Sequence, residues 1–156
     1  MKKGFTLIEL VVVMGILLVI GAVVVVSLAG RRTDTDIVAV TVEIATTLRQ
    51  AQADSIAVEG GQPWGVRFAN SATGTPSYAL FTGASYASGT VKGYYRLPNT
   101  VAYVTSTLAS GATLDVIFSP VTGASSVSTS VKFYMPAEST AYSSTISISP
   151  AGVVSY

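Results

Sequence analysis

The feature that most constrains this chain is a long apolar run near its start. Residues 5–28 form about 24 almost uninterrupted apolar positions, which at the rise of an α-helix are enough to cross a hydrocarbon core of roughly 30 Å. Glu9 lies close to the beginning of this run. The pattern predicts a membrane-spanning helix that carries one carboxylate near one of its ends.

Glu9 needs a positive partner if it lies in the membrane. A carboxylate in the bilayer costs about 2.5–3.5 kcal/mol even on lenient insertion scales. An ammonium group buried beside it lowers this cost, because a buried ion pair is far less costly than either ion alone. The amine can belong to a neighbouring chain, or Glu9 can fold back onto the first turn of its own helix, four residues from Phe5. The residues alone leave both arrangements open.

The residues before Glu9 form a specific motif. The chain begins with Met1, Lys2, Lys3 and Gly4, followed by Phe-Thr-Leu-Ile-Glu-Leu. This start resembles, position for position, the class III leader and mature start of type IV pilins and of type II secretion pseudopilins. The resemblance implies that prepilin peptidase cuts after Gly4 and methylates the new N-terminus at Phe5, and that the leader residues Lys2 and Lys3 stay in the cytoplasm. It further implies that Glu9 neutralises the N-terminal amine of a neighbouring subunit during filament assembly.

Two other interpretations fit part of this segment. The first takes residues 1–29 as an ordinary secretory signal with a cleavage site of small residues at 27–29, so that the mature chain begins at Gly30. Ordinary apolar signal cores span about 7–15 residues, which is shorter than this run. The second is an uncleaved signal anchor on an unrelated exported domain. That interpretation leaves Gly4 and Glu9 without a role.

The composition excludes several classes of function. The chain has 156 residues, a net charge of +1, no cysteine and no histidine. Its length leaves room for one exported domain of modest size, and its charge does not draw it to nucleic acid or lipid. Without His and Cys, the commonest general base, the thiol nucleophile and nearly all zinc sites are missing. We therefore expect no enzyme activity, no metal site and no cofactor.

Helical periodicity returns after a polar stretch at residues 30–36. One face, with apolar or small residues at three- and four-residue steps, consists of Ile37, Val40, Ile44, Leu48, Ala51 and Ser55. The other faces hold Glu43, Thr47, Arg49, Gln50 and Asp54. Paired glycines and a proline at residues 60–63 end the helix. We therefore predict one helical spine with a membrane half and a soluble half that ends near Val58.

The remaining sequence has the pattern of short β-strands separated by Ser, Thr, Gly and Pro clusters. These runs lie at residues 64–68, 78–81, 94–97, 101–105, 114–118, 131–135, 145–149 and 153–156. We predict an α+β, pilin-like fold in which the long N-terminal helical spine packs against a C-terminal antiparallel β head. The expected domains are a cleaved leader (1–4), a transmembrane and assembly half of the helix (5–29), an exported half of the helix (30–59) and a β-rich head (60–156).

Weaker resemblances favour one group within this superfamily. Residues 48–57 with the strand at 64–68, residues 118–123 and residues 146–154 resemble the H-type minor pseudopilins. The implied function is that of a structural subunit of a short type II secretion pseudopilus that supports protein export. The implied partners are prepilin peptidase, other pilins or pseudopilins, an inner-membrane assembly platform and membrane lipid. The implied location is the inner membrane, in a single pass with an exported head, and then a periplasmic or cell-surface filament.

Two alternatives share the same architecture. One is a DNA-binding minor pilin of a competence system, which needs several Lys or Arg side chains on one face to contact phosphates. Lys92, Tyr94, Tyr95 and Arg96 are the candidate patch, because basic and aromatic residues interleave there. The simpler interpretation of these residues is a strand with solvated charges. The other alternative is a major pilin subunit.

Overall fold

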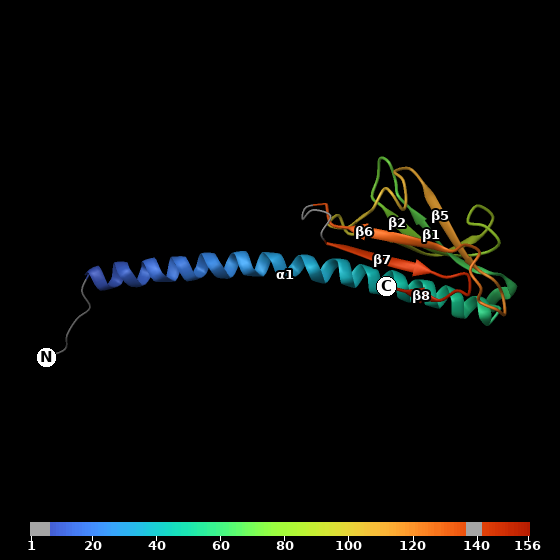
Figure 1. Cartoon of the computed structure of the whole chain (residues 1–156), viewed down its shortest axis with the longest axis horizontal. Helices are drawn as coiled ribbons and strands as arrows, with labels where there is room; N and C mark the ends of the chain where they lie inside the picture. The colour runs from blue at the N-terminus through green and yellow to red at the C-terminus, as the bar shows by residue number, and fades with distance from the viewer. Residues whose placement is uncertain (1–6, 137–141) are drawn as a thin grey trace. The chain divides into compact units, whose positions relative to one another are not determined.

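The structure is a computed structural model that describes residues 7–136 and 142–156. Of residues 23–35 it describes the backbone alone. The chain divides into two compact units, residues 1–35 and 36–156. Helix α1 (Leu7–Ile56) contributes to both units, whereas every described strand belongs to the second (Figure 1). The architecture is α+β, with an N-terminal helix and a C-terminal antiparallel β region, as predicted from the sequence.

Within the described residues, eight strands follow α1. In chain order the further elements are the short 3₁₀ helix η1 (Glu59–Gly61), β1 (Trp64–Ala69), β2 (Ser77–Thr82), β3 (Thr90–Arg96), β4 (Ala102–Tyr103), β5 (Thr113–Phe118), β6 (Thr129–Tyr134), β7 (Ser143–Ile148) and β8 (Val154–Ser155). Each strand overlaps one of the runs predicted from β-branched and aromatic residues. The largest difference is at β3, which begins at Thr90 rather than at Tyr94.

The first unit contains the start of α1. Of the predicted membrane half at residues 5–29, the side chains of residues 7–22 are described, and all of them are exposed. Within the described residues, no helix reaches the length and mean hydropathy of a membrane span.

The described strands form two antiparallel sheets of four strands each. The first sheet has the order β3-β2-β1-β5 and the second has the order β4-β6-β7-β8. In the first sheet, Trp64 of β1 lies opposite Thr82 of β2 and Phe118 of β5, so β1 is a central strand. In the second sheet, β7 lies between β6 and β8 (Figure 1). Since the pairing is antiparallel throughout, the predicted character of the head is confirmed.

One hydrophobic core joins both sheets to the second half of α1. The predicted helix face is buried, from Ile37 to Ser55, and it contacts core side chains of both sheets such as Val66, Phe68 and Ile146. One assignment was wrong: Thr47 is buried, although the pattern placed it on a polar face. Its hydroxyl donates to the carbonyl oxygen of Glu43 at 3.0 Å, and this local bond satisfies the polar group inside the core.

Tyrosines link the elements of the core. The Tyr103 ring contacts Phe68 of the first sheet and Phe133 of the second, and its hydroxyl donates to the carbonyl of Ser77 at 2.9 Å. The Tyr78 hydroxyl donates to the Glu43 carboxylate at 2.7 Å and so connects β2 to α1. Burial raises the pKa of Tyr103, and burial followed by the hydrogen bond to Glu43 raises the pKa of Tyr78.

These raised pKa values predict a loss of stability in alkali. An unperturbed tyrosine ionises near pH 10, so above that pH the unfolded chain releases protons that the folded chain retains. The stabilising contribution is therefore complete below about pH 10 and decreases as the pH rises further. We expect the urea midpoint of the detergent-solubilised chain to fall between pH 9 and pH 11, and Tyr103→Phe to reduce that fall.

The matched control for this measurement is Tyr94→Phe, because the Tyr94 ring is exposed on β3. It removes the same hydroxyl from a site that water reaches in both states. Equal pH dependence in Tyr103→Phe and in the unchanged protein would contradict the explanation.

Candidate assembly site

The start of α1 presents apolar side chains on every side. Leu7, Ile8 and Leu18 are 83%, 72% and 75% exposed, and none of residues 7–22 is buried. A helix that is apolar around its whole circumference is found inside a protein core, inside an assembly or in a membrane, and not as a lone helix in water. This surface therefore requires an apolar environment outside the single chain.

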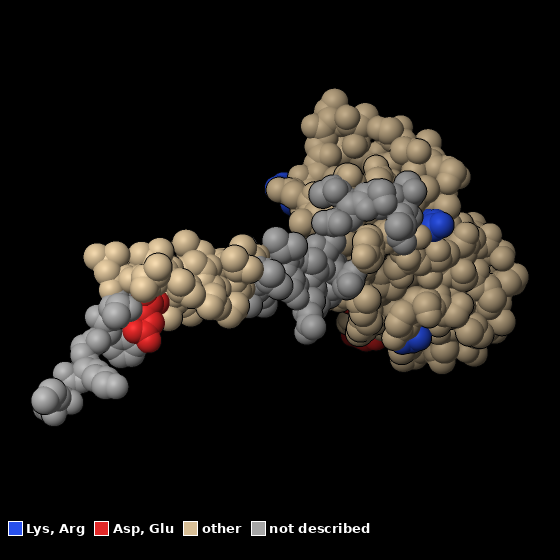
Figure 2. Space-filling view, turned by 60° about the vertical axis from the view of Figure 1, so that its left-hand side comes forward, with Lys and Arg blue, Asp and Glu red and all other residues tan. Residues whose placement is uncertain are grey.

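Glu9 is the only charged residue among residues 7–22 and lies in the first turn of α1. Figure 2 shows this as an isolated acidic area on the N-terminal helical segment. Together with Leu10, Val13, Met14 and Leu17, it lines a shallow hollow along one flank of the helix. The positive end of the helix dipole favours a carboxylate in this turn. The arrangement thus places one carboxylate beside an apolar flank of the helix.

The predicted processing residues Lys2, Lys3, Gly4 and Phe5 lie outside the described residues. Cleavage after Gly4, methylation of Phe5 and the pairing of Glu9 with an N-terminal amine therefore stay predictions.

The candidate DNA-binding residues all lie on β3, an edge strand of the first sheet. Successive side chains of a strand point to opposite faces, so Tyr94 and Arg96 share one face and Tyr95 lies on the other. The Tyr95 ring stacks on Tyr78 with ring centres 4.9 Å apart. The structure therefore does not bring all of these side chains onto one face of β3.

Lys92 is engaged within the second unit. The register between β2 and β3 shifts at this residue, because Leu80 pairs with Gly93 while Phe81 pairs with Val91. The Lys92 ammonium lies 5.9 Å from the centre of the Trp64 ring, within reach of a cation–π contact. On the face of the second unit seen in Figure 2, basic side chains lie singly rather than in a cluster. DNA binding by Lys92, Tyr94, Tyr95 and Arg96 stays a prediction.

A junction at the end of α1 was not identified from the sequence. The Ser55 hydroxyl donates to the carbonyl of Phe118 at 2.6 Å, and the Gln52 amide donates to the carbonyl of Gly123 at 3.1 Å. Gly152 lies against Gly123 and Gln52, where a β-carbon would overlap both. The segments 48–57, 118–123 and 146–154, which are far apart in the sequence, therefore meet at this junction. The signals that could have indicated it are the two glycines, which adopt positive φ of 65° and 82°.

Comparison with known protein families gives a match at the start of the chain. Residues 1–28 match the family described as the prokaryotic N-terminal methylation motif. Neither the curated proteins nor the solved structures contain a significant match to the chain. The motif implies a membrane-anchored precursor, processing by prepilin peptidase and assembly with other pilins. This match to residues 1–28 supports a type IV pilin-like precursor that is cleaved by prepilin peptidase.

Proposed function

We propose that this chain is a minor pseudopilin, a structural subunit of a type II secretion-type pseudopilus that supports protein export. The observation that carries the proposal is the methylation motif at residues 1–28 followed directly by a helix that is exposed and apolar at residues 7–22, with Glu9 as its only charge. Such a helix suits insertion in the membrane before assembly and packing among other helices afterwards.

The proposed assembly step depends on Glu9. Cleavage after Gly4 frees the amine of Phe5, and entry into the filament buries that amine in apolar surroundings. The Glu9 carboxylate of a neighbouring subunit then supplies the opposite charge. Burying either the amine or the carboxylate alone in a medium of low dielectric costs free energy. Positions of the helix in which only one of the two ions is buried without its partner are therefore unfavourable. Charge pairing of this kind sets the position of an incoming subunit, while the apolar flank supplies most of the contact area.

The placement in the H-type minor group rests on three weaker resemblances in the exported part of the chain. The three segments meet at the junction formed by Gln52, Ser55 and Gly123. The resemblance therefore concerns segments that contact one another in the fold, and not separate turns. The resemblance also separates the minor group from the major pseudopilins, whose family calcium site needs clustered C-terminal acids. In this chain the Asp115 carboxylate is held by Arg67 in a two-point ion pair with distances of 2.5 and 2.7 Å. Such pairing leaves Asp115 poorly suited to bind a cation.

The first test is mass spectrometry of filaments sheared from native cells. We expect a mature chain that begins with methylated Phe5 and is present at trace abundance relative to other pilin-like chains. The same start in the dominant species would make the chain a major filament subunit instead. A mature start at Gly30 would contradict the assignment as a prepilin altogether, because it indicates an ordinary signal sequence.

A further inference from the structure

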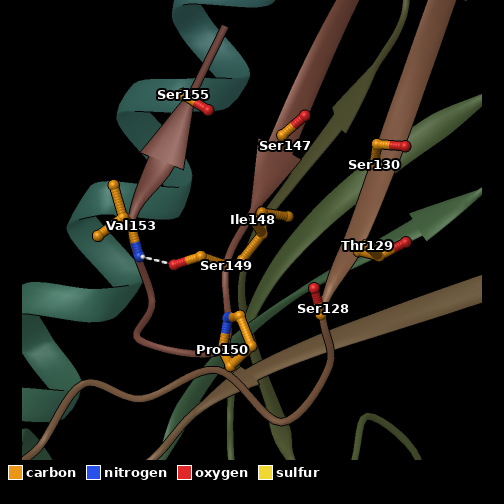
Figure 3. Close-up of a pocket in the computed structure, with 9 residues that line it drawn as sticks. All are labelled: Ser128, Thr129, Ser130, Ser147, Ile148, Ser149, Pro150, Val153 and Ser155. Atoms are coloured by element: carbon orange, nitrogen blue, oxygen red, sulfur yellow. Dashed lines mark hydrogen bonds between the residues drawn. The ribbon is translucent and has the colours of Figure 1, made fainter.

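The outer face of the second sheet holds a hollow of about 520 Å³, a volume in the range of small-molecule sites. Figure 3 shows that its lining comes from β6, β7, β8 and the turns that adjoin them. Five serines and one threonine contribute to this lining, together with Ile148, Pro150 and Val153. Among the residues that the structure describes, no Lys, Arg, Asp or Glu side chain lines this hollow. We call it the serine hollow.

The sheet register aligns three of these serines. Ser130 of β6 lies opposite Ser147 of β7, and Ser147 lies opposite Ser155 of β8. Directly opposed residues in an antiparallel pair have Cβ atoms about 4.5–5.5 Å apart. The three hydroxyls therefore form a row across the sheet, as Figure 3 shows.

These hydroxyls are available to a ligand. Among residues 7–136 and 142–156, the hydroxyls of Ser130, Ser147 and Ser155 take part in no hydrogen bond, whereas Ser149 accepts from the Val153 amide at 3.1 Å. Some other serines of the second unit, such as Ser55 and Ser125, use their hydroxyls in hydrogen bonds within the fold. The row thus offers both donors and acceptors that the fold does not use.

The lining also selects the chemistry of a ligand. An anion or a cation would lose hydration without gaining an opposite charge in the serine hollow. Val153 is 62% exposed beside the hydroxyl row, and Pro150 adds a second exposed apolar surface. A sugar ring combines the matching features, since it has apolar C–H faces and edges of neutral hydroxyls. We propose that the serine hollow binds a neutral oligosaccharide.

The test uses the full chain solubilised in a zwitterionic detergent, because detergents with sugar headgroups would compete. Labelled protein is applied to an array of neutral, sialylated and sulfated glycans, and the best neutral oligosaccharide is then titrated by calorimetry. We expect saturable binding of neutral glycans and about tenfold weaker binding by Ser147→Val, which removes the donor and acceptor at the centre of the row.

Thr145→Val is the matched control. Thr145 lies on β7 opposite Lys132, two residues from Ser147 and outside the hollow, and valine suits a strand at both positions. We expect its affinity to change less than twofold and its unfolding temperature to match that of Ser147→Val. Ser130→Val should weaken binding as Ser147→Val does. Absence of neutral glycan binding, binding restricted to charged glycans, or full binding by Ser147→Val would overturn the proposal.

Discussion

Replacing Glu9 with alanine should leave cleavage after Gly4 largely intact while lowering incorporation into filaments more than tenfold. The reason is that, in the proposed assembly step, the variant would leave a buried amine without its carboxylate. Removing one partner of a buried ion pair costs about 3–5 kcal/mol, and each 1.4 kcal/mol corresponds to a factor of ten in affinity. The measurement compares the processed chain in the membrane with the chain in sheared filaments by quantitative mass spectrometry.

Two further variants separate charge from packing. Glu9→Gln keeps the size of the side chain and removes only its charge, so it should fail as Glu9→Ala does. Val13→Ala removes apolar surface from the same flank of α1 and should be incorporated nearly normally. Normal incorporation of Glu9→Gln would contradict pairing between the amine and the carboxylate.

A chemical cross-link distinguishes the two possible partners of Glu9. A carbodiimide joins an amine directly to a carboxylate without a spacer. If the Phe5 amine of one subunit meets Glu9 of the next, the product is a covalent dimer in assembled filaments. If Glu9 instead pairs with its own N-terminus, the product stays within one chain.

The sequence was most informative where a signal is local. Helical spacing from Ile37 to Ala51 identified the buried face of α1, because the period of a helix is set by neighbouring residues alone. Strand positions were predictable for a similar reason, since β-branched and aromatic residues gather in short runs. Thr47 was assigned to a polar face because its side chain carries a hydroxyl. A hydrogen bond from this hydroxyl to the Glu43 carbonyl allows the side chain to be buried.

Features that depend on strand pairing could not be predicted. The row formed by Ser130, Ser147 and Ser155 exists only in the register that aligns β6, β7 and β8. Nothing local to any of these serines indicates that register. The candidate patch on β3 shows the opposite case, because residues close together in sequence point to different faces once the strand forms. The assembly site differs from both, since Gly4, Phe5 and Glu9 form a continuous motif that can be interpreted without the fold.

Gly152→Ala should produce a large loss of stability, because it disrupts the junction at the end of α1. Gly152 has a φ of 82°, and a β-carbon there would overlap the Gly123 carbonyl and the Gln52 amide. The positive φ alone costs a non-glycine residue about 1–2 kcal/mol. Loss of the hydrogen bond from Gln52 to Gly123 adds about 0.5–1.5 kcal/mol. We therefore expect a total loss of about 1.5–3.5 kcal/mol, measured by urea unfolding of the detergent-solubilised chain.

Gly111→Ala isolates the part of this effect that comes from the junction. Gly111 has nearly the same φ, 80°, but a β-carbon there would meet only the Ala72 side chain at an ordinary 3.7 Å. Gly111→Ala should therefore lower the free energy of unfolding only by the backbone contribution of about 1–2 kcal/mol. If Gly152→Ala loses more unfolding free energy than Gly111→Ala, the difference is the stability that comes from the close approach of Gly152, Gly123 and Gln52. This approach holds the late strands against α1. Equal losses in the two variants would mean that the junction adjusts to a methyl group and that its segments are held together by the hydrophobic core alone.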